Sequence, residues 1–177
     1  MKKRDIWISV AIIAAAVLLL FSYSQDKGQK GQIKIDAGGA VAKLQLAGGL
    51  FNKATISSGA GLTKVKAGVR RPEWLKMSMQ QGSSTCQLDS RGPWGDLSTI
   101  KVTNNNATAL RLGPPFLIKP KVRKSGSNVS IDFAVIGNAG EHYGNSIMRN
   151  NKRAPAPKLE IVDEAGNVLA SGKFAYG

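Results

Sequence analysis

The segment KVRKSGSNVSIDFAV, residues 121–135, decides the fold class. Its apolar side chains fall on every second residue: Val129, Ile131, Phe133 and Val135. Because successive side chains of a strand point to opposite faces, this alternation predicts a strand with one half-buried face. Similar short alternations, broken by glycine, asparagine and serine, continue along the chain. With no helical spacing over three turns outside the N-terminal segment, the sequence predicts an all-β chain, folded as an antiparallel β-sandwich.

Two loops predict hairpins. VTNNNATAL, residues 102–110, places asparagines between two alternating runs, and asparagine tolerates the left-handed backbone that tight turns need. IVDEAGNVLAS, residues 161–171, places a Glu-Ala-Gly-Asn loop between two further runs. We therefore expect each loop to join two antiparallel neighbours.

A domain boundary is expected at LGPPFL, residues 112–117, because two successive prolines cannot donate to a sheet ladder. This predicts an N-terminal anchor at residues 1–27 and two β-modules at residues 28–113 and 114–177. The second module would be small, so one continuous sandwich is the alternative.

Three stretches carry a resemblance to known families. LTKVKAGVRRPEWLKMSM at 62–79, followed by STIKVTNNNATALRLG at 98–113, is similar to the late strands of prealbumin-like modules of bacterial envelope proteins. KLEIVDEAGNVLASGKFAYG at 158–177 resembles the final hairpin of an immunoglobulin-like domain. Such families include many binding and spacer modules, so the resemblance implies a fold and a class of protein but no particular activity.

The N-terminus predicts a membrane anchor. Residues 6–25 are uncharged, and twenty helical residues span about 30 Å, which matches the hydrocarbon core of a bilayer. Lys2, Lys3 and Arg4 precede this stretch and should hold the N-terminus in the cytoplasm. We therefore expect a single-pass protein of the inner (cytoplasmic) membrane, with its C-terminal region outside the cytoplasm. A cleaved signal peptide is the alternative.

The charge predicts anionic partners. Without Lys2, Lys3, Arg4 and Asp5, the chain carries 22 basic and 10 acidic side chains, a net charge of +12. This bias favours anionic neighbours such as phosphate-bearing envelope polymers or acidic lipid head groups, or else a protein partner. The alternative is a lysine-rich surface that only solvates the chain. We expect no specific nucleic-acid binding, because no basic cluster resembles a recognition helix. Apart from the pair Arg70 and Arg71, the basic side chains form two local clusters, at residues 119–124 and 149–153, and we expect these two clusters to lie near each other. Their members are Lys119, Lys121, Arg123, Lys124, Arg149, Lys152 and Arg153.

Trp94 is a further candidate for binding. It lies in RGPWGDL, residues 91–97, between Pro93 and Gly95. An indole in such a turn either folds back over the end of the sandwich or stays exposed beside an arginine to meet a sugar ring or an acidic peptide.

His142 is the only histidine, and Glu141 and Tyr143 flank it. On a strand, Glu141 and His142 would point to opposite faces, so the carboxyl group could not easily orient the imidazole. No Gly-x-Ser-x-Gly elbow supplies a nucleophile either. We therefore expect a structural loop and no enzyme activity. The chain shows no small-molecule or cofactor motif and no Cys-x-x-Cys or histidine pair for zinc. The alternative is a periplasmic copper carrier or an enzyme that uses His142 with Met77 and Met79, supported by Cys86 and Met148, since soft ligands suit Cu(I).

Overall fold

The computed structural model describes residues 29–49, 52–144 and 147–174. The predicted membrane anchor at residues 6–25 lies outside these residues. Across the described ranges, no helix is long and apolar enough to cross a membrane. Strands dominate the part of the chain that the structure describes, and the helical elements there are two short 3-10 turns, η1 (Ser58–Ala60) and η2 (Gly95–Ser98). The all-β prediction is therefore confirmed.

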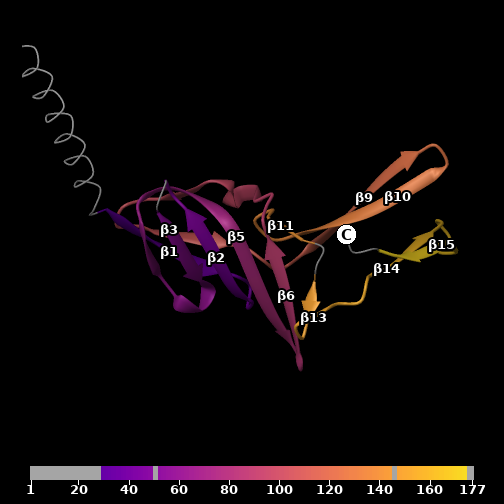
Figure 1. The fold of residues 1–177 in the computed structure, drawn as a ribbon, viewed down its shortest axis with the longest axis horizontal. Coiled ribbons are helices and arrows are strands. Elements are labelled where there is room, and N and C mark those ends of the chain that lie inside the picture. The colour runs from indigo at the N-terminus through magenta and orange to yellow at the C-terminus, as the bar shows by residue number, and fades with distance from the viewer. Residues whose placement is uncertain (1–28, 50–51, 145–146, 175–177) are drawn as a thin grey trace, which may run out of the picture.

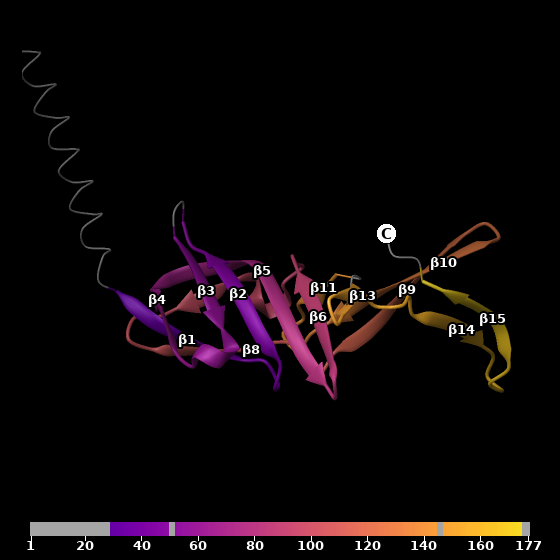
Figure 2. The ribbon, with the colours of Figure 1, turned by 60° about the horizontal axis from the view of Figure 1, so that its bottom comes forward.

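Two sheets form the body of the molecule (Figures 1 and 2). The smaller sheet has the order β4-β1-β8, with β1 (Lys30–Asp36), β4 (Thr63–Lys66) and β8 (Ala107–Arg111). The larger sheet contains β2 (Val41–Ala47), β3 (Lys53–Ser57), β5 (Gly68–Gln81), β6 (Ser84–Ser90), β12 (Met148–Arg149) and β13 (Lys152–Arg153).

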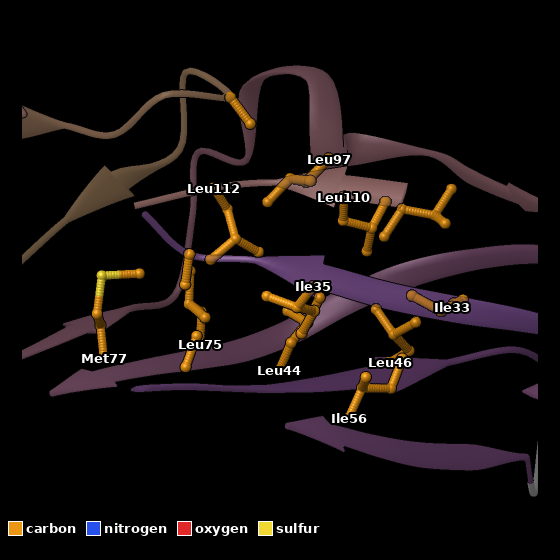
Figure 3. Close-up of a cluster of buried hydrophobic side chains, with 14 of the residues drawn as sticks. Ile33, Ile35, Leu44, Leu46, Ile56, Leu75, Met77, Leu97, Leu110 and Leu112 are labelled. Carbon is orange, nitrogen blue, oxygen red and sulfur yellow. The ribbon is translucent and has the colours of Figure 1, made fainter. Parts of the chain in front are cut away.

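Alternating apolar residues build the core between these sheets (Figure 3). Ile33 and Ile35 project from β1 toward Leu44 and Leu46 of β2, and each of the four is at most 3% exposed. Full burial of one such side chain contributes about 1.5 to 3 kcal/mol. The period-two pattern of the sequence therefore places its apolar face in the core, as a half-buried strand requires.

The strand β6, STCQLDS, was missed from the sequence. Its residues Ser84, Leu88 and Ser90 point inward, but only Leu88 is strongly apolar. Its pairing with β5 runs from Leu75 opposite Ser90 to Gln81 opposite Ser84. A strand is recognised in a sequence by apolar residues at every second position, and serine occupies two of the inward positions of β6.

The hairpin predicted at residues 102–110 is wrong. Strand β7 (Ile100–Val102) pairs with the start of β5, whereas β8 runs parallel to β1. The asparagine loop between them is tied to β1, because Asn105 N–H donates to Lys30 O and Gln32 N–H donates to Asn106 O. The loop therefore connects β7, which pairs with β5, to β8, which pairs with β1.

The hairpin predicted at residues 161–171 is confirmed. Strand β14 (Lys158–Val162) pairs antiparallel with β15 (Val168–Lys173). In the turn, Asp163 Oδ1 accepts hydrogen bonds from the amides of Ala165 and Asn167, at 3.0 and 2.8 Å. The side-chain amide of Asn167 also donates to Asp163 Oδ2, at 3.0 Å. This side-chain hydrogen bond is the largest cause of the lowered pKa of the Asp163 carboxyl, and the backbone hydrogen bonds lower the pKa further.

Residues on both sides of the expected boundary share one core. Val135, Ala139 and Tyr143 are buried with the residues of β1, β2 and β5. Beyond them β12 pairs with β6, opposite Gln87 and Cys86. The turn from β12 to β13 uses Asn150 and Asn151, whose φ angles are 51° and 61°. Both asparagines thus adopt the left-handed backbone that a two-residue hairpin turn requires.

Candidate binding surface

A long hairpin leaves the body of the molecule (Figures 1 and 2). It consists of β9 (Leu117–Ser125) and β10 (Asn128–Ile136), and β11 (His142–Tyr143) pairs with β10 only at Val135 and Ile136. All nine residues of β9 are exposed. The candidate binding residues between 119 and 124 therefore lie on an arm with solvent around them.

One face of this arm is basic. Directly opposite residues of an antiparallel pair share a face, and the register puts Lys119 opposite Ala134, Lys121 opposite Asp132 and Arg123 opposite Ser130. We call Lys119, Lys121 and Arg123 the basic face. Asp132 is the only carboxyl among these opposing residues, and its Oδ1 also accepts the Phe133 amide at 2.8 Å. The basic face therefore keeps an excess of positive charge.

The other face of the arm is apolar. The register places Ile118 opposite Val135, Pro120 opposite Phe133, and Val122 opposite Ile131, with Val129 opposite Lys124 near the tip. Ile118 and Val122 are 65% and 62% exposed, which is unusual for side chains that a sheet could bury. The arm is thus amphipathic, with much of its apolar side in water.

The apolar face meets the β14–β15 hairpin across an open groove. Phe133 contacts Phe174 with ring centroids 4.7 Å apart. Beyond this contact lies a groove of about 590 Å³, lined by residues of both hairpins. Its lining residues are Arg123, Val129, Ser130, Ile131, Asp132, Leu159, Ile161, Ala170, Ser171, Gly172, Lys173 and Phe174. We call this space the hairpin groove.

A buried carboxyl group fastens the base of the arm. Glu141 is 0% exposed, and its Oε1 accepts the Gly113 amide at 2.6 Å and the Tyr143 hydroxyl at 2.8 Å. Its Oε2 accepts the Ala139 amide at 2.9 Å. Gly113 precedes β9 and Ala139 follows β10, so one side chain ties together both ends of the arm.

The packing around Glu141 leaves no room for change at Gly137. A Cβ on Gly137 would come within 2.1 Å of Glu141 Oε1. Burial raises the pKa of the Tyr143 hydroxyl far above its usual range, and the negative charge of Glu141 raises it further. Tyr143 is therefore held as a neutral donor. The hydrogen bonds of Glu141 hold this part of the fold together.

His142 lies apart from this arrangement, as the sequence predicts for neighbours on a strand. Its amide donates to Pro93 O at 2.8 Å, and its side chain is half-buried. Since Tyr143 points inward to Met77, with its hydroxyl 3.8 Å from the sulfur, His142 on the same strand points to the other face. Glu141 was expected in a structural loop, but the sequence carried no signal for its complete burial.

The soft ligands of the copper alternative are divided. Met77 is 1% exposed and belongs to the core, and Met79 lies opposite Cys86 on the same inward face. Met148 lies opposite Gln87, the residue next to Cys86 on β6. Adjacent strand residues point to opposite faces, so Met148 lies on the opposite face of the sheet from Cys86. Among the described residues, no group of three histidine, cysteine, aspartate or glutamate side chains could hold a metal ion.

The remaining candidates lie on the body of the molecule. Arg149, Lys152 and Arg153 belong to β12 and β13, in a different sheet from the arm, and all three are exposed. The guanidinium of Arg149 donates to Ser84 Oγ at 3.2 and 3.1 Å. Trp94 is half-buried and packs against the core.

The basic pair Arg70 and Arg71 is also divided. Arg70 is 4% exposed and donates to Lys66 O, and its guanidinium fills the space beside Gly48. Arg71 is exposed. Lys119, Lys121 and Arg123 therefore share one face of the protruding arm. Among the described residues, Lys30, Lys34 and Lys64 also share a face, the outer face of the β4-β1-β8 sheet.

No family model, no curated protein and no solved structure matches this chain. The class of protein defined here is thus an all-β body with a protruding, amphipathic and basic arm.

Proposed function

We propose that this chain is a binding module of the cell envelope, anchored in the cytoplasmic membrane by residues 6–25, and that it contacts an anionic partner through the basic face. On this proposal its β-sandwich region lies outside the cytoplasm and supports the arm. The observation that carries the proposal is the basic face itself, three cations on one side of a strand whose nine residues are all exposed.

Two features support a binding role over a merely solvating one. Lys119, Lys121 and Arg123 project from alternate positions of a strand whose nine residues are all exposed, so one partner can reach all three from the same side. In addition, Glu141 fixes both ends of the arm to the core, so the arm has a defined base. A fixed array of cations on a projecting element is suited to contacting several anionic groups at once.

The test measures binding of the full chain, in a nonionic detergent, to long-chain inorganic polyphosphate. The variant replaces Lys119, Lys121 and Arg123 by glutamine. The matched control replaces Lys34, Lys43 and Lys101, three exposed lysines of the body, so it removes the same charge.

We expect the affinity of the unaltered chain to fall at least about tenfold between 50 and 200 mM salt, because bound polyanions release counterions. The arm variant should bind more weakly and with a flatter salt dependence than the control variant. Thermal stability should stay nearly unchanged in both, because exposed charges contribute little to folding. Equal binding by both variants, or binding without salt dependence, would refute the proposal.

A further inference from the structure

The hairpin groove runs along strand edges. Four consecutive residues of β10, 129–132, line it, and so do four consecutive residues of β15, 170–173. Side chains of consecutive strand residues alternate between faces, so a groove that touches all of them reaches the edge of each strand. Leu159 and Ile161 of β14 add the adjacent face of the second hairpin.

Both edges lack a strand partner within the described residues. On the side away from β9, β10 pairs with β11 only at Val135 and Ile136, which leaves residues 128–134 without a neighbour there. The β14–β15 sheet has two strands and ends at β15. An isolated two-stranded hairpin is at best marginally stable in water, and three or more strands with an apolar face are needed for independent stability.

The apolar lining comes from both hairpins. Val129 and Ile131 contribute from β10, and Leu159 and Ile161 contribute from β14. Val129 and Ile161 are 53% and 39% exposed. A polyphosphate or another hydrophilic polymer would leave these side chains in water, whereas an extended polypeptide with apolar side chains would cover them.

The charges around the groove favour an acidic occupant. Arg123 and Lys173 line it against one carboxyl, that of Asp132. Lys158 lies directly opposite Lys173 in the β14–β15 pair, and like charges in that position repel each other. A second copy of this chain, with a net charge of +14, is opposed by the same field.

Resting on the proposed function, we propose that the hairpin groove takes an extended strand of a partner protein, with alternating apolar and acidic side chains. The strand pairs with the edges of β10 and β15 and joins the two hairpins into one five-stranded sheet. Its apolar side chains cover Val129, Ile131, Leu159 and Ile161, and its carboxylates meet Arg123 and Lys173. Main-chain hydrogen bonds give affinity in this mode of recognition, and the side-chain alternation gives specificity.

The probe is a fluorescein-labelled peptide of ten residues that alternates valine and glutamate. The full chain, in a nonionic detergent, is titrated against it by fluorescence anisotropy. A second peptide has the same sequence with N-methyl groups on alternate residues, which removes the amide donors of one edge. Polyglutamate of similar length supplies the charge without the apolar side chains.

A groove variant is available that spares the fold. A Cβ on Gly172 meets no atom within 4 Å, and its backbone does not adopt a positive φ, so Gly172→Leu places an apolar side chain at the groove with room for its Cβ. Gly59, in η1 on the body, is equally open and serves as the matched site for Gly59→Leu. Thermal unfolding of both variants confirms that they fold.

We expect the Val-Glu peptide to bind at least about tenfold more tightly than the N-methylated peptide and than polyglutamate. Gly172→Leu should weaken peptide binding at least about tenfold, and Gly59→Leu should leave it unchanged. Hydrogen exchange at β10 and β15 should slow when the peptide is bound.

Equal binding of all three ligands would overturn the inference and show that charge alone is recognised. Self-association of the chain that Gly172→Leu abolishes would also overturn it, in favour of a second copy as the occupant. If the peptide fails while salt-dependent polyphosphate binding through the basic face persists, the inference falls and the proposed function stands. If polyphosphate binding is indifferent to the basic face, the proposed function falls.

Discussion

At the scale of single residues, Glu141 connects the arm to the core. Its carboxyl oxygens accept three hydrogen bonds from groups that are otherwise surrounded by buried side chains. A buried polar group is costly unless its partners are present, and each partner left without an acceptor pays a desolvation penalty. The stability of this region therefore depends on one side chain.

Replacing Glu141 by glutamine should lower the free energy of unfolding by roughly 2 to 4 kcal/mol, because the amide group supplies one acceptor and would place N–H donors against other donors. Urea denaturation followed by tryptophan fluorescence measures the change. His142→Ala, at the neighbouring position, is the control and should cost less than about 1 kcal/mol. A Glu141→Gln variant as stable as the control would show that the carboxyl group is not needed.

Tyr143 predicts a particular response to alkaline pH. Its pKa is raised in the fold, whereas an unfolded tyrosine ionises near pH 10. The stabilisation is therefore complete below about pH 10 and is lost as the pH rises above it, at up to about 1.4 kcal/mol per pH unit. Urea denaturation between pH 9 and 11 should show a steeper fall for the unaltered chain than for Tyr143→Phe. Parallel pH profiles would contradict this explanation.

At the scale of elements, the arm differs from the strands of the body. The core strand β2 is paired on both sides at residues 43–47, and β5 has a partner along almost all of its length. By contrast, β9 has one neighbour and no buried residue. Elements with few buried contacts open at a lower free energy than the core. The arm and the body should therefore behave as separate cooperative units.

Hydrogen exchange of the free chain tests this difference. Amides of β9 and β10 should exchange roughly 100-fold faster than the paired amides of β2 and β5, because local opening exposes the arm without unfolding the body. Mass spectrometry of peptic fragments resolves these segments. Uniform protection across all four strands would mean that the arm is as stable as the core.

At the scale of the whole molecule, the proposal places the sandwich and its arm outside the cytoplasm. A reporter that needs export, fused after Gly177, should be active, and a reporter that works only in the cytoplasm should be inactive. Replacing Lys2, Lys3 and Arg4 by glutamate should reduce the exported fraction, because basic residues before a span favour the cytoplasmic side. An active cytoplasmic reporter on the unaltered chain would contradict this orientation.

The period-two alternation was sufficient to predict the all-β class and many strands, because a strand buries every second residue whatever its neighbours are. Thus Ile33, Leu44 and Val135 all lie in the core. Local turn chemistry predicted the β14–β15 hairpin for the same reason, since Asp163 and its loop close on themselves. The basic residues of β9 were candidates from their clustering alone.

Tertiary structure decided which strands become neighbours and which side chains meet. The asparagine loop after β7 has the local sequence of a hairpin turn, but β7 and β8 do not pair with each other. Instead, β7 pairs with β5 and β8 pairs with β1. The burial of Glu141 depends on amides 28 and 2 residues away, and the hairpin groove depends on two hairpins meeting at Phe133 and Phe174. Periodicity and local turns can be read from the sequence alone. Strand pairing and burial depend on contacts between segments that are distant in the chain. The entropy lost in bringing such segments together, and the free energy gained by burying their side chains, depend on the whole fold.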